Sequence, residues 1–397
     1  MPQAGGQEVK THVKSIHEVL DTTLLERFRS RAAGYDAENT FCVDDFEELT
    51  EVGYLKAMLP VARGGLGWGM EQMTSAQRLL GSYAPATALA VNMHLVWTGV
   101  ATLLGARGDR RLETVLDWVA NGEVMAFGVS EAGNDEVLFD SVTRAVPAPD
   151  GSYAFSGVKV FTSLAPVWTR LGVFGKDSST EEPKLVHGFL HRDASGIEIP
   201  DNWNTLGMRA TQSNTTILSN ARVKAEDIHS ILPVGPVADP LIFGIFAAFL
   251  SLTASVYVGL AERGMQLAAT NPARRTSLKN AGRAYDQDPD IRWQVANAGM
   301  EILKLDAMLR LTTRDLDDLV DHGPSWFPRL VTLRTQAGDA ARSCMDIAAK
   351  VSGGGQYFRG SEFERLYRDA LASLYHPSDA ESAHSTVASW LLGPVKE

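Results

Sequence analysis

Hydrophobic residues recur at helical spacing through the first third of the chain. Leu20, Leu24 and Phe28 fall on one face of a helix, and the same period continues, with breaks, to about residue 125. The run Pro60–Gly69 (PVARGGLGWG) interrupts it, because clustered glycines mark a break between helices. The pattern therefore predicts an N-terminal helical domain over residues 1–123.

The pattern changes near Glu123 to short runs rich in β-branched and aromatic residues, separated by turn signals such as Pro149-Asp150-Gly151. Such spacing is typical of a small antiparallel sheet or barrel. No glycine-rich dinucleotide fingerprint follows a strand here, so a Rossmann domain has no support. We expect a middle β domain over residues 124–235, with strands at 125–129, 143–146, 153–155, 158–161, 171–174, 185–190 and 215–218.

Long helical periods return after Pro240. They predict a C-terminal four-helix-bundle domain over residues 236–397, with helices at 240–271, 286–321, 325–352, 361–375 and 379–392. The fold class that follows is mainly α with an inserted antiparallel β domain between two helical domains.

Two uncharged runs, Ala84–Leu104 and Pro240–Ala261, are long enough to span a bilayer. The first contains the polar residues Asn92 and His94, and the second lacks the Lys/Arg anchors that flank membrane helices. Helices that are apolar all round also form the centre of large soluble helical domains. We therefore expect two buried core helices and no membrane insertion.

Composition narrows the possible functions. The chain has 397 residues, and its net charge of −11 makes it a poor candidate for nucleic-acid binding, which needs a clustered basic face. The two cysteines, Cys42 and Cys344, cannot form a disulfide framework or a cysteine-based zinc site. The polar segment Met1–Lys10 has no apolar core of a secretory signal. These features predict a cytoplasmic protein with no metal centre.

Candidate chemistry gathers in the C-terminal half. Arg274, Arg275, Lys279 and Arg283 form a local cationic cluster, which in most proteins is a solvated helix face. Three adjacent glycines at 353–355 would let the backbone approach a ligand or another chain, although a plain turn between helices has the same composition. Further on, His376 lies between an aromatic residue and a proline.

Short motifs occur in an ordered set along nearly the whole chain. They include Val129-Ser130-Glu131, Gly157-x-Lys159-x-Phe161-x-Ser163, Leu206-Gly207-Met208-Arg209, Arg274-Arg275-Thr276, Gly353-Gly354 and Tyr367-Arg368-Asp369-Ala370. Each motif alone is weak evidence. Together, and in this order, they give a chain that resembles the acyl-CoA dehydrogenase superfamily of flavoproteins.

The resemblance implies an FAD cofactor between the β domain and the C-terminal bundle. Val129 and Ser130, with Phe127, would contact the flavin ring, while Phe161 would pack on it and the Ser163 hydroxyl would hydrogen-bond its edge. The remaining implied cofactor contacts are Arg275, Leu278, Gly353, Gly354 and Asp379.

Arg275 matches the arginine that grips the FAD pyrophosphate, often across a subunit interface, because a guanidinium binds phosphate bidentately. Gly353 and Gly354 match a close backbone approach to a neighbouring chain's cofactor. A homodimer or homotetramer follows from the resemblance. The loop that begins at Glu131 is shorter than is usual in the superfamily, so its contacts stay open.

The base of the dehydrogenase reaction is missing at both positions where the superfamily keeps a glutamate. The usual position holds Pro377, directly after His376, and the alternative position in the apolar helix holds Phe249. In a typical member this carboxylate removes the α-proton of an acyl thioester while hydride passes from the β-carbon to flavin N5.

Three interpretations are open. Our main hypothesis is desaturation of an acyl-CoA or acyl-carrier thioester, with His376 as the base, or with Asp379 or Glu381 in its place, and a separate electron acceptor. The alternative is a flavin monooxygenase of the same fold, supplied by a flavin reductase, with His376, Ser163 and His94 around the ring and nitrogen, sulfur or aromatic carbon as the oxidised atom. A catalytically silent flavin-binding scaffold is the third.

Overall fold

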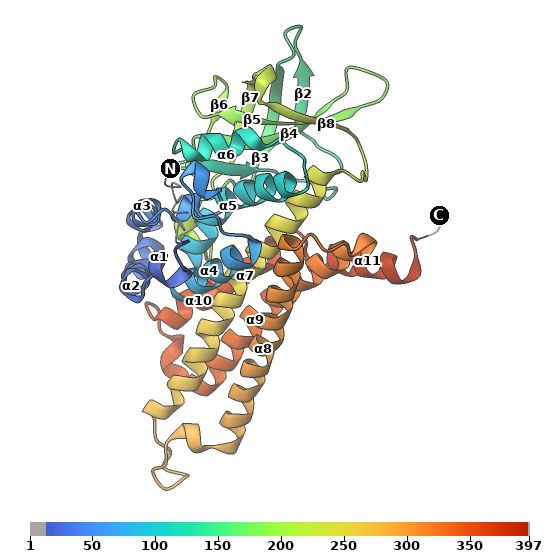
Figure 1. Cartoon of the computed structure of the whole chain (residues 1–397). Helices are drawn as coiled ribbons and strands as arrows, with labels where there is room; N and C mark the ends of the chain where they lie inside the picture. The colour runs from blue at the N-terminus through green and yellow to red at the C-terminus, as the bar shows by residue number, and fades with distance from the viewer. Residues whose placement is uncertain (1–12, 396–397) are drawn as a thin grey trace, which may run out of the picture.

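The computed structural model describes residues 13–395 and contains helices, then a β sheet, then longer helices (Figure 1). Met1–Lys10, where we expected no secretory signal, lies outside the described residues. The Asp21 carboxylate caps the second helix by accepting from the Leu24 amide, and Pro85 begins the fifth, where its missing N–H costs nothing. The helices before the sheet are α1 (Ile16–Val19), α2 (Thr22–Glu38), α3 (Val43–Glu51), α4 (Met70–Tyr83), α5 (Pro85–Ala106) and α6 (Glu113–Ala120).

The sheet has the strand order β6-β7-β3-β2-β4-β5-β8, with β1 also paired to β4. Most pairs are antiparallel, as predicted, but β1 and β2 both run parallel to β4, so the sheet is mixed. The strands are β1 (Met125–Gly128), β2 (Arg144–Pro147), β3 (Tyr153–Lys159), β4 (Arg170–Asp177), β5 (Lys184–His191), β6 (Ile197–Glu198), β7 (Thr216–Val223) and β8 (Ile228–Pro233).

The two parallel partners β1 and β2 occupy successive stretches of the same edge of β4. Residues 170–173 of β4 pair with β1, and Lys176 pairs with β2. The segment 129–143 between β1 and β2 therefore leaves the sheet as a loop. This loop carries Val129, Ser130 and Glu131.

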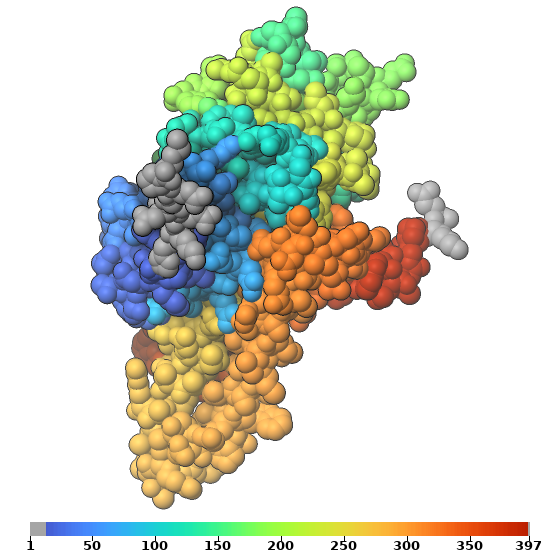
Figure 2. Space-filling model, in the orientation of Figure 1, coloured from blue at the N-terminus to red at the C-terminus, as the bar shows by residue number. Residues whose placement is uncertain are grey.

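The C-terminal helices are α7 (Pro240–Thr270), α8 (Pro289–Asp317), α9 (Trp326–Ser352), α10 (Glu362–Leu371) and α11 (Ala380–Leu392). Helix α7 lies at the centre and packs against α4, α5, α8 and α9. The far ends of α7, α8 and α9 project away from the sheet, and α11 points sideways out of the body (Figures 1 and 2).

The two apolar helices lie in the core. Helix α5 and the segment Pro240–Arg274 are long and apolar enough to cross a membrane, but 89% of the most apolar window of each is buried inside the protein. This burial fits the expectation of core helices.

A buried ion pair anchors the start of the 129–143 loop to the sheet. Lys159 Nζ donates to Glu131 Oε1 at 2.7 Å and to the Phe174 carbonyl at 2.8 Å, and neither charged side chain is exposed to solvent. The same carboxylate accepts from the Thr143 amide at 3.0 Å, which ties the end of the loop to its beginning. Burial opposes ionisation of Glu131, but Lys159 and the hydrogen bonds lower its pKa to about 2.

Glu131→Gln should lower the free energy of unfolding by about 3 to 5 kcal/mol, because it leaves the Lys159 ammonium buried without its counter-ion. Urea denaturation monitored by circular dichroism measures the loss. Asp150→Asn is the matched control, since Asp150 pairs with Arg222 on an exposed surface and its removal should hardly change the midpoint. Equal effects of the two variants would contradict the anchoring role.

Candidate functional site

A cavity of about 320 Å³ lies where the sheet meets the helices of both halves of the chain. Its walls come from β1, α5, α7, the segment 203–213 and the chain around the end of α10. Twenty residues line it: Leu89, Met93, Phe127, Ser130, Phe161, Ser163, Trp203, Thr205, Leu206, Gly207, Met208, Thr211, Ser213, Phe249, Arg368, Leu371, Ala372, Tyr375, His376 and Pro377. The structure thus brings together five residues that the sequence had singled out: Phe127, Ser130, Phe161, Ser163 and His376.

Aromatic rings form one wall. Phe127 of β1 stacks on Phe249 of α7 with ring centroids 5.4 Å apart and planes 17° apart. Behind it, Trp97 of α5 packs against Phe127 and donates its indole N–H to the Ala126 carbonyl at 2.9 Å. This stacking fixes the wall and presents flat apolar surface to the cavity.

A row of buried hydroxyls forms another part of the lining. Ser163 Oγ lies 2.7 Å from Ser213 Oγ, which lies 2.7 Å from Thr211 Oγ1. Thr211 donates onward to the Met208 carbonyl at 2.9 Å. Each hydroxyl has a hydrogen-bond partner, so the row is fixed in place and can present polar edges to a ligand.

Phe161 projects toward the cavity from just beyond β3. Its φ of 59° lies in the left-handed region, and its side chain is 51% exposed beside the edge of the Trp203 ring. An exposed aromatic side chain on strained backbone is costly in a folded chain. A planar ligand that covers Phe161 would offset part of this cost.

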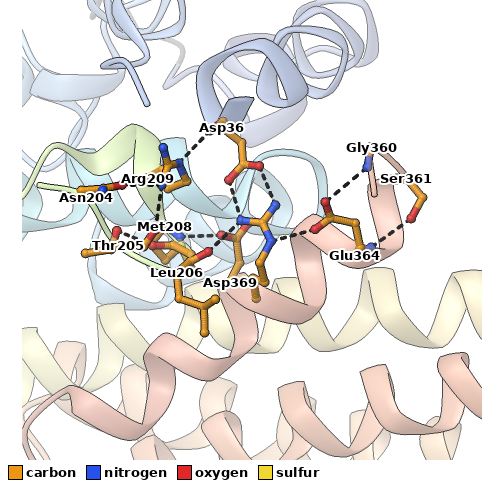
Figure 3. Close-up of polar contacts among 12 residues, drawn as sticks. Asp36, Asn204, Thr205, Leu206, Met208, Arg209, Gly360, Ser361, Glu364 and Asp369 are labelled. Carbon is orange, nitrogen blue, oxygen red and sulfur yellow. Dashed lines mark hydrogen bonds and ion pairs between the residues drawn. The ribbon is translucent and has the colours of Figure 1, made fainter. Parts of the chain in front are cut away.

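The segment 203–208, which forms the roof of the cavity, is held by α10 (Figure 3). Arg368 donates to the Leu206 carbonyl at 2.7 Å, and the Met208 amide donates to Asp369 Oδ1. Between them, Gly207 lies so close to the Arg368 carbonyl that a Cβ would stand 2.4 Å from that oxygen. We call these contacts the roof clamp.

The charge of Arg368 is neutralised within the protein. Its NH1 and NH2 groups donate to the two carboxylate oxygens of Asp36 at 2.9 and 2.6 Å, and its Nε donates to Glu364 at 2.7 Å. All three guanidinium nitrogens are therefore engaged. The roof clamp thereby also connects α2 to α10.

His376 faces the cavity next to Pro377, at the start of the turn that follows α10. Its Nε2 lies 2.7 Å from the hydroxyl of Tyr257, which is buried within α7. Arg334 donates to the His376 carbonyl at 2.9 Å. Burial, reinforced by the positive charge of Arg334, lowers the pKa of His376 to about 3, so the imidazole is neutral at physiological pH.

No Asp or Glu is among the described residues that line the cavity. Both positions where the superfamily keeps its glutamate do line it, and they hold Phe249 and Pro377. Asp379 faces elsewhere, because its carboxylate caps α11 by accepting from the Ser382 amide at 2.8 Å. Neither Asp379 nor Glu381 reaches the cavity in this structure.

The structure does not bring His94 to the cavity. Its Nε2 lies 2.8 Å from the Leu55 carbonyl, and its Nδ1 accepts from the Met125 amide at 3.0 Å. Both nitrogens are thus used to join α5 to β1 and to the segment after α3, and burial lowers the pKa of His94 to about 4. His94 is a core residue with a satisfied ring.

The expected cofactor residues of the C-terminal half lie elsewhere. Arg275 donates to the Ser352 carbonyl at 2.8 Å and lies against Gly353, while Leu278 is fully exposed. Neither Gly353 nor Gly354 lines the cavity. Helix α7 continues for about 30 Å beyond Phe249 before the chain reaches Arg275, so this cluster lies far from the cavity of its own chain. Val129 lines a smaller adjoining cavity of about 30 Å³.

Several residues of the site carried no predicted role. Trp203 and Ser213 lie in irregular segments, and Thr211 ends the short 3-10 helix Arg209–Thr211. Tyr257, which reaches the site only through His376, lies in a helix whose apolar composition pointed only to core. The Leu206-Gly207-Met208 motif belonged to the resemblance, but only the structure shows that it forms the roof.

Comparisons with known proteins agree with this architecture. Residues 251–375 match the family described as acyl-CoA dehydrogenase, C-terminal domain. Over 95% of this chain, the fold superposes on nitrososynthase from Micromonospora carbonacea var. africana with a TM-score of 0.83 and 24% identity, covering 96% of that chain. FMN-bound TdsC from Paenibacillus sp. A11-2 gives a TM-score of 0.82 at 20% identity, with 94% of this chain and 97% of that chain covered. The resemblance to the acyl-CoA dehydrogenase superfamily and the predicted fold class are confirmed.

The sequence relatives include a nitrososynthase and a monooxygenase on one side and a protein named as a dehydrogenase on the other. L-evernosamine nitrososynthase from Micromonospora sp. is 26% identical, covering 88% of this chain and 83% of that protein. Dibenzothiophene monooxygenase from Mycolicibacterium goodii is 25% identical, with 83% and 80% covered. YdbM from Bacillus subtilis (strain 168), provisionally named an acyl-CoA dehydrogenase, is 24% identical, with 89% and 91% covered.

Asp369→Asn tests the buried carboxylate of the roof clamp. Burial raises the pKa of Asp369 to about 6, from an ordinary value near 3.9 in the unfolded chain. Between pH 4 and 6 the folded state therefore holds more protons than the unfolded state, and this carboxyl makes the protein less stable as pH rises. The asparagine, which can still accept from Met208, should remove that loss.

The stability of Asp369→Asn relative to the parent should thus improve by about 3 kcal/mol between pH 4 and 6. Urea midpoints across this range measure the change. Asp193→Asn, at a carboxyl whose side chain is 89% exposed, is the control. A constant difference between Asp369→Asn and the parent would show that Asp369 does not titrate in this window.

Proposed function

We propose that this protein of the acyl-CoA dehydrogenase superfamily is a flavin-dependent monooxygenase that takes its reduced flavin from a separate reductase. One observation carries the proposal. Both positions that supply the carboxylate base in dehydrogenases face the cavity, and they hold Phe249 and Pro377. The site retains the features expected around a flavin ring and lacks the group that desaturation requires.

His376 is a poor substitute for the missing base. The α-proton of a thioester is only weakly acidic, so its removal needs a base whose conjugate acid holds a proton near neutral pH. The pKa of His376, lowered to about 3 by burial and by Arg334, is several units below that range. Our main hypothesis of desaturation therefore loses support, and the alternative of oxygenation gains it.

The cavity fits a flavin ring. Phe127 and Phe161 offer apolar faces, and the row Ser163-Ser213-Thr211 offers hydroxyls that can hydrogen-bond to a polar ring edge. A reduced flavin bound there would supply the two electrons that let one atom of O₂ enter the substrate while the other leaves as water.

Tyr257 sets the hydrogen-bonding state of His376 in this scheme. Burial keeps the Tyr257 hydroxyl protonated by raising its pKa, and among the described residues its hydrogen-bond partner is His376 Nε2. A buried hydroxyl is best satisfied by donating, which leaves the imidazole proton on Nδ1. His376 then acts as a fixed neutral hydrogen-bond donor, and the apolar walls exclude water.

The relatives support this proposal. A nitrososynthase and dibenzothiophene monooxygenases are among the proteins that this chain resembles over most of its length, and TdsC has been solved with FMN. They favour oxygenation of a heteroatom. The flavin is thus FMN or FAD.

We further propose that a second copy of the chain completes flavin binding. Arg275 and Gly353 are too far from their own cavity to touch a flavin in it, and the resemblance implies that a neighbouring subunit supplies these groups. Trp293, Met300 and Leu303 are exposed along α8, an apolar surface that an oligomer would cover. A homodimer or homotetramer accounts for both features.

The decisive experiment supplies the purified protein with FMN or FAD, NADH, a flavin reductase and air, and follows oxygenated product from a panel of nitrogen and sulfur compounds. We expect product that depends on the protein, on reduced flavin and on O₂. In parallel, anaerobic acyl-CoAs of short, branched and long chain should leave the flavin absorbance unchanged. Bleaching by any acyl-CoA would restore the dehydrogenase hypothesis.

His376→Asn and Tyr257→Phe test the polar pair. Loss of the imidazole should reduce product formation by about 10² to 10³-fold, as expected for one positioned hydrogen-bond donor, and loss of the Tyr257 hydroxyl by about tenfold, because that group only orients the ring. The product formed per NADH consumed should fall in both variants. Thr253→Ser, on the same helix but away from the cavity, should keep the parent ratio. If His376→Asn forms as much product per NADH consumed as the parent, His376 has no role in the reaction.

A further inference from the structure

Arg368 is the sole permanently charged residue among the described residues that line the cavity. Its guanidinium is paired with Asp36 and Glu364 and also donates to the Leu206 carbonyl. A ligand carboxylate or phosphate would have to displace these partners to reach it, and would leave Asp36 and Glu364 without their cation. Arg368 therefore holds the roof and is not free to bind an anion.

Two further arginines near the cavity are committed as well. Arg334, which is 3% exposed, donates to the carbonyls of Ser373 and His376, and Arg209 donates to the carbonyls of Asp36 and Thr205. Neither lines the cavity. His376 itself is neutral. The cavity consequently offers no unpaired positive charge to offset the desolvation of an anionic ligand.

The remaining surface is apolar or uncharged. Leu89, Met93, Phe249, Leu371 and Tyr375 face the cavity from the helices. Trp203 and Leu206 add to this surface from the roof, and the polar side-chain groups besides Arg368 are hydroxyls and one imidazole. Such a lining gains free energy by burying apolar area and loses it by burying charge.

We infer that the substrate is a neutral, mostly apolar ring compound, bound beside the flavin ring under the roof segment 203–208, and that this segment determines the specificity. The inference rests on the proposed monooxygenase function and names its substrate class. It disfavours nucleotide-linked sugars, carboxylates and thioesters of CoA, whose charges would have no partner in this lining. Because a flavin ring would occupy part of the cavity of about 320 Å³, the remaining space suits only a compact molecule.

Leu206 is the residue through which this selectivity can be altered. Its backbone is held by Arg368, while its side chain lines the cavity and is 61% exposed, so a longer side chain fits there without entering the core. An arginine at this position would give an incoming anion the unpaired cation that the parent lacks.

The test is equilibrium dialysis of the oxidised, FMN-loaded protein, without turnover, against three probes: benzothiophene, its carboxylate derivative and thymidine diphosphate. We expect benzothiophene to bind at least tenfold more tightly than either anion. Leu206→Arg should reduce this preference over the carboxylate at least tenfold. Ile231→Arg, on an exposed position of β8 away from the cavity, should keep the parent preference.

The parent alone can overturn the inference, so it does not depend on the variant folding. Equal or tighter binding of either anion, or no binding of benzothiophene, would refute a neutral apolar substrate. If folded Leu206→Arg keeps the parent's preference for benzothiophene, the roof segment does not determine the selectivity. Selective binding without oxygenated product in the reductase assay would instead refute the monooxygenase function and leave the ligand class standing.

Discussion

The roof clamp is the contact on which the rest of the site depends. Three parts of the chain far apart in sequence meet at Arg368 and Asp369: α2 through Asp36, the roof segment through Leu206 and Met208, and α10 itself (Figure 3). The segment 203–208 has no regular hydrogen bonding of its own. Without the clamp, Leu206 and Met208 would lose the contacts that hold the roof to α10, although Asn39 would still donate to the Trp203 carbonyl.

The same clamp decides which charges the cavity can use. Asp36 and Glu364 neutralise Arg368 at the place where a ligand would otherwise meet it, and the buried Arg334 faces backbone carbonyls. The two arginines Arg368 and Arg334, both close to the cavity, are thus directed at the protein's own structure. A site lined by aromatic rings, aliphatic side chains and paired hydroxyls results.

The sequence predicted the elements well where periodicity is strong. The long helices after Pro240 begin and end within a few residues of the expected positions, since caps and apolar faces mark them. It missed β6, which has only two residues, and β8, whose polar alternation resembles a loop. The parallel pairing of β1 and β2 with β4 could not be predicted, because it depends on how the chain crosses between halves of the fold.

Within the site, a residue could be predicted only where its neighbours in the sequence form a recognisable motif or are unusual. Phe161, Ser163 and His376 belong to motifs or to an unusual neighbourhood, whereas Tyr257 is one polar atom in a helix that is otherwise core. His94 was predicted to be catalytic because a histidine in an apolar helix suggests chemistry. The structure shows instead that the backbones of Leu55 and Met125 satisfy both of its ring nitrogens. Both histidines are uncharged, and their different contacts give them different roles. His94 joins core elements. His376, which is equally uncharged, lines the cavity, where it can offer a neutral hydrogen bond but cannot act as a strong base.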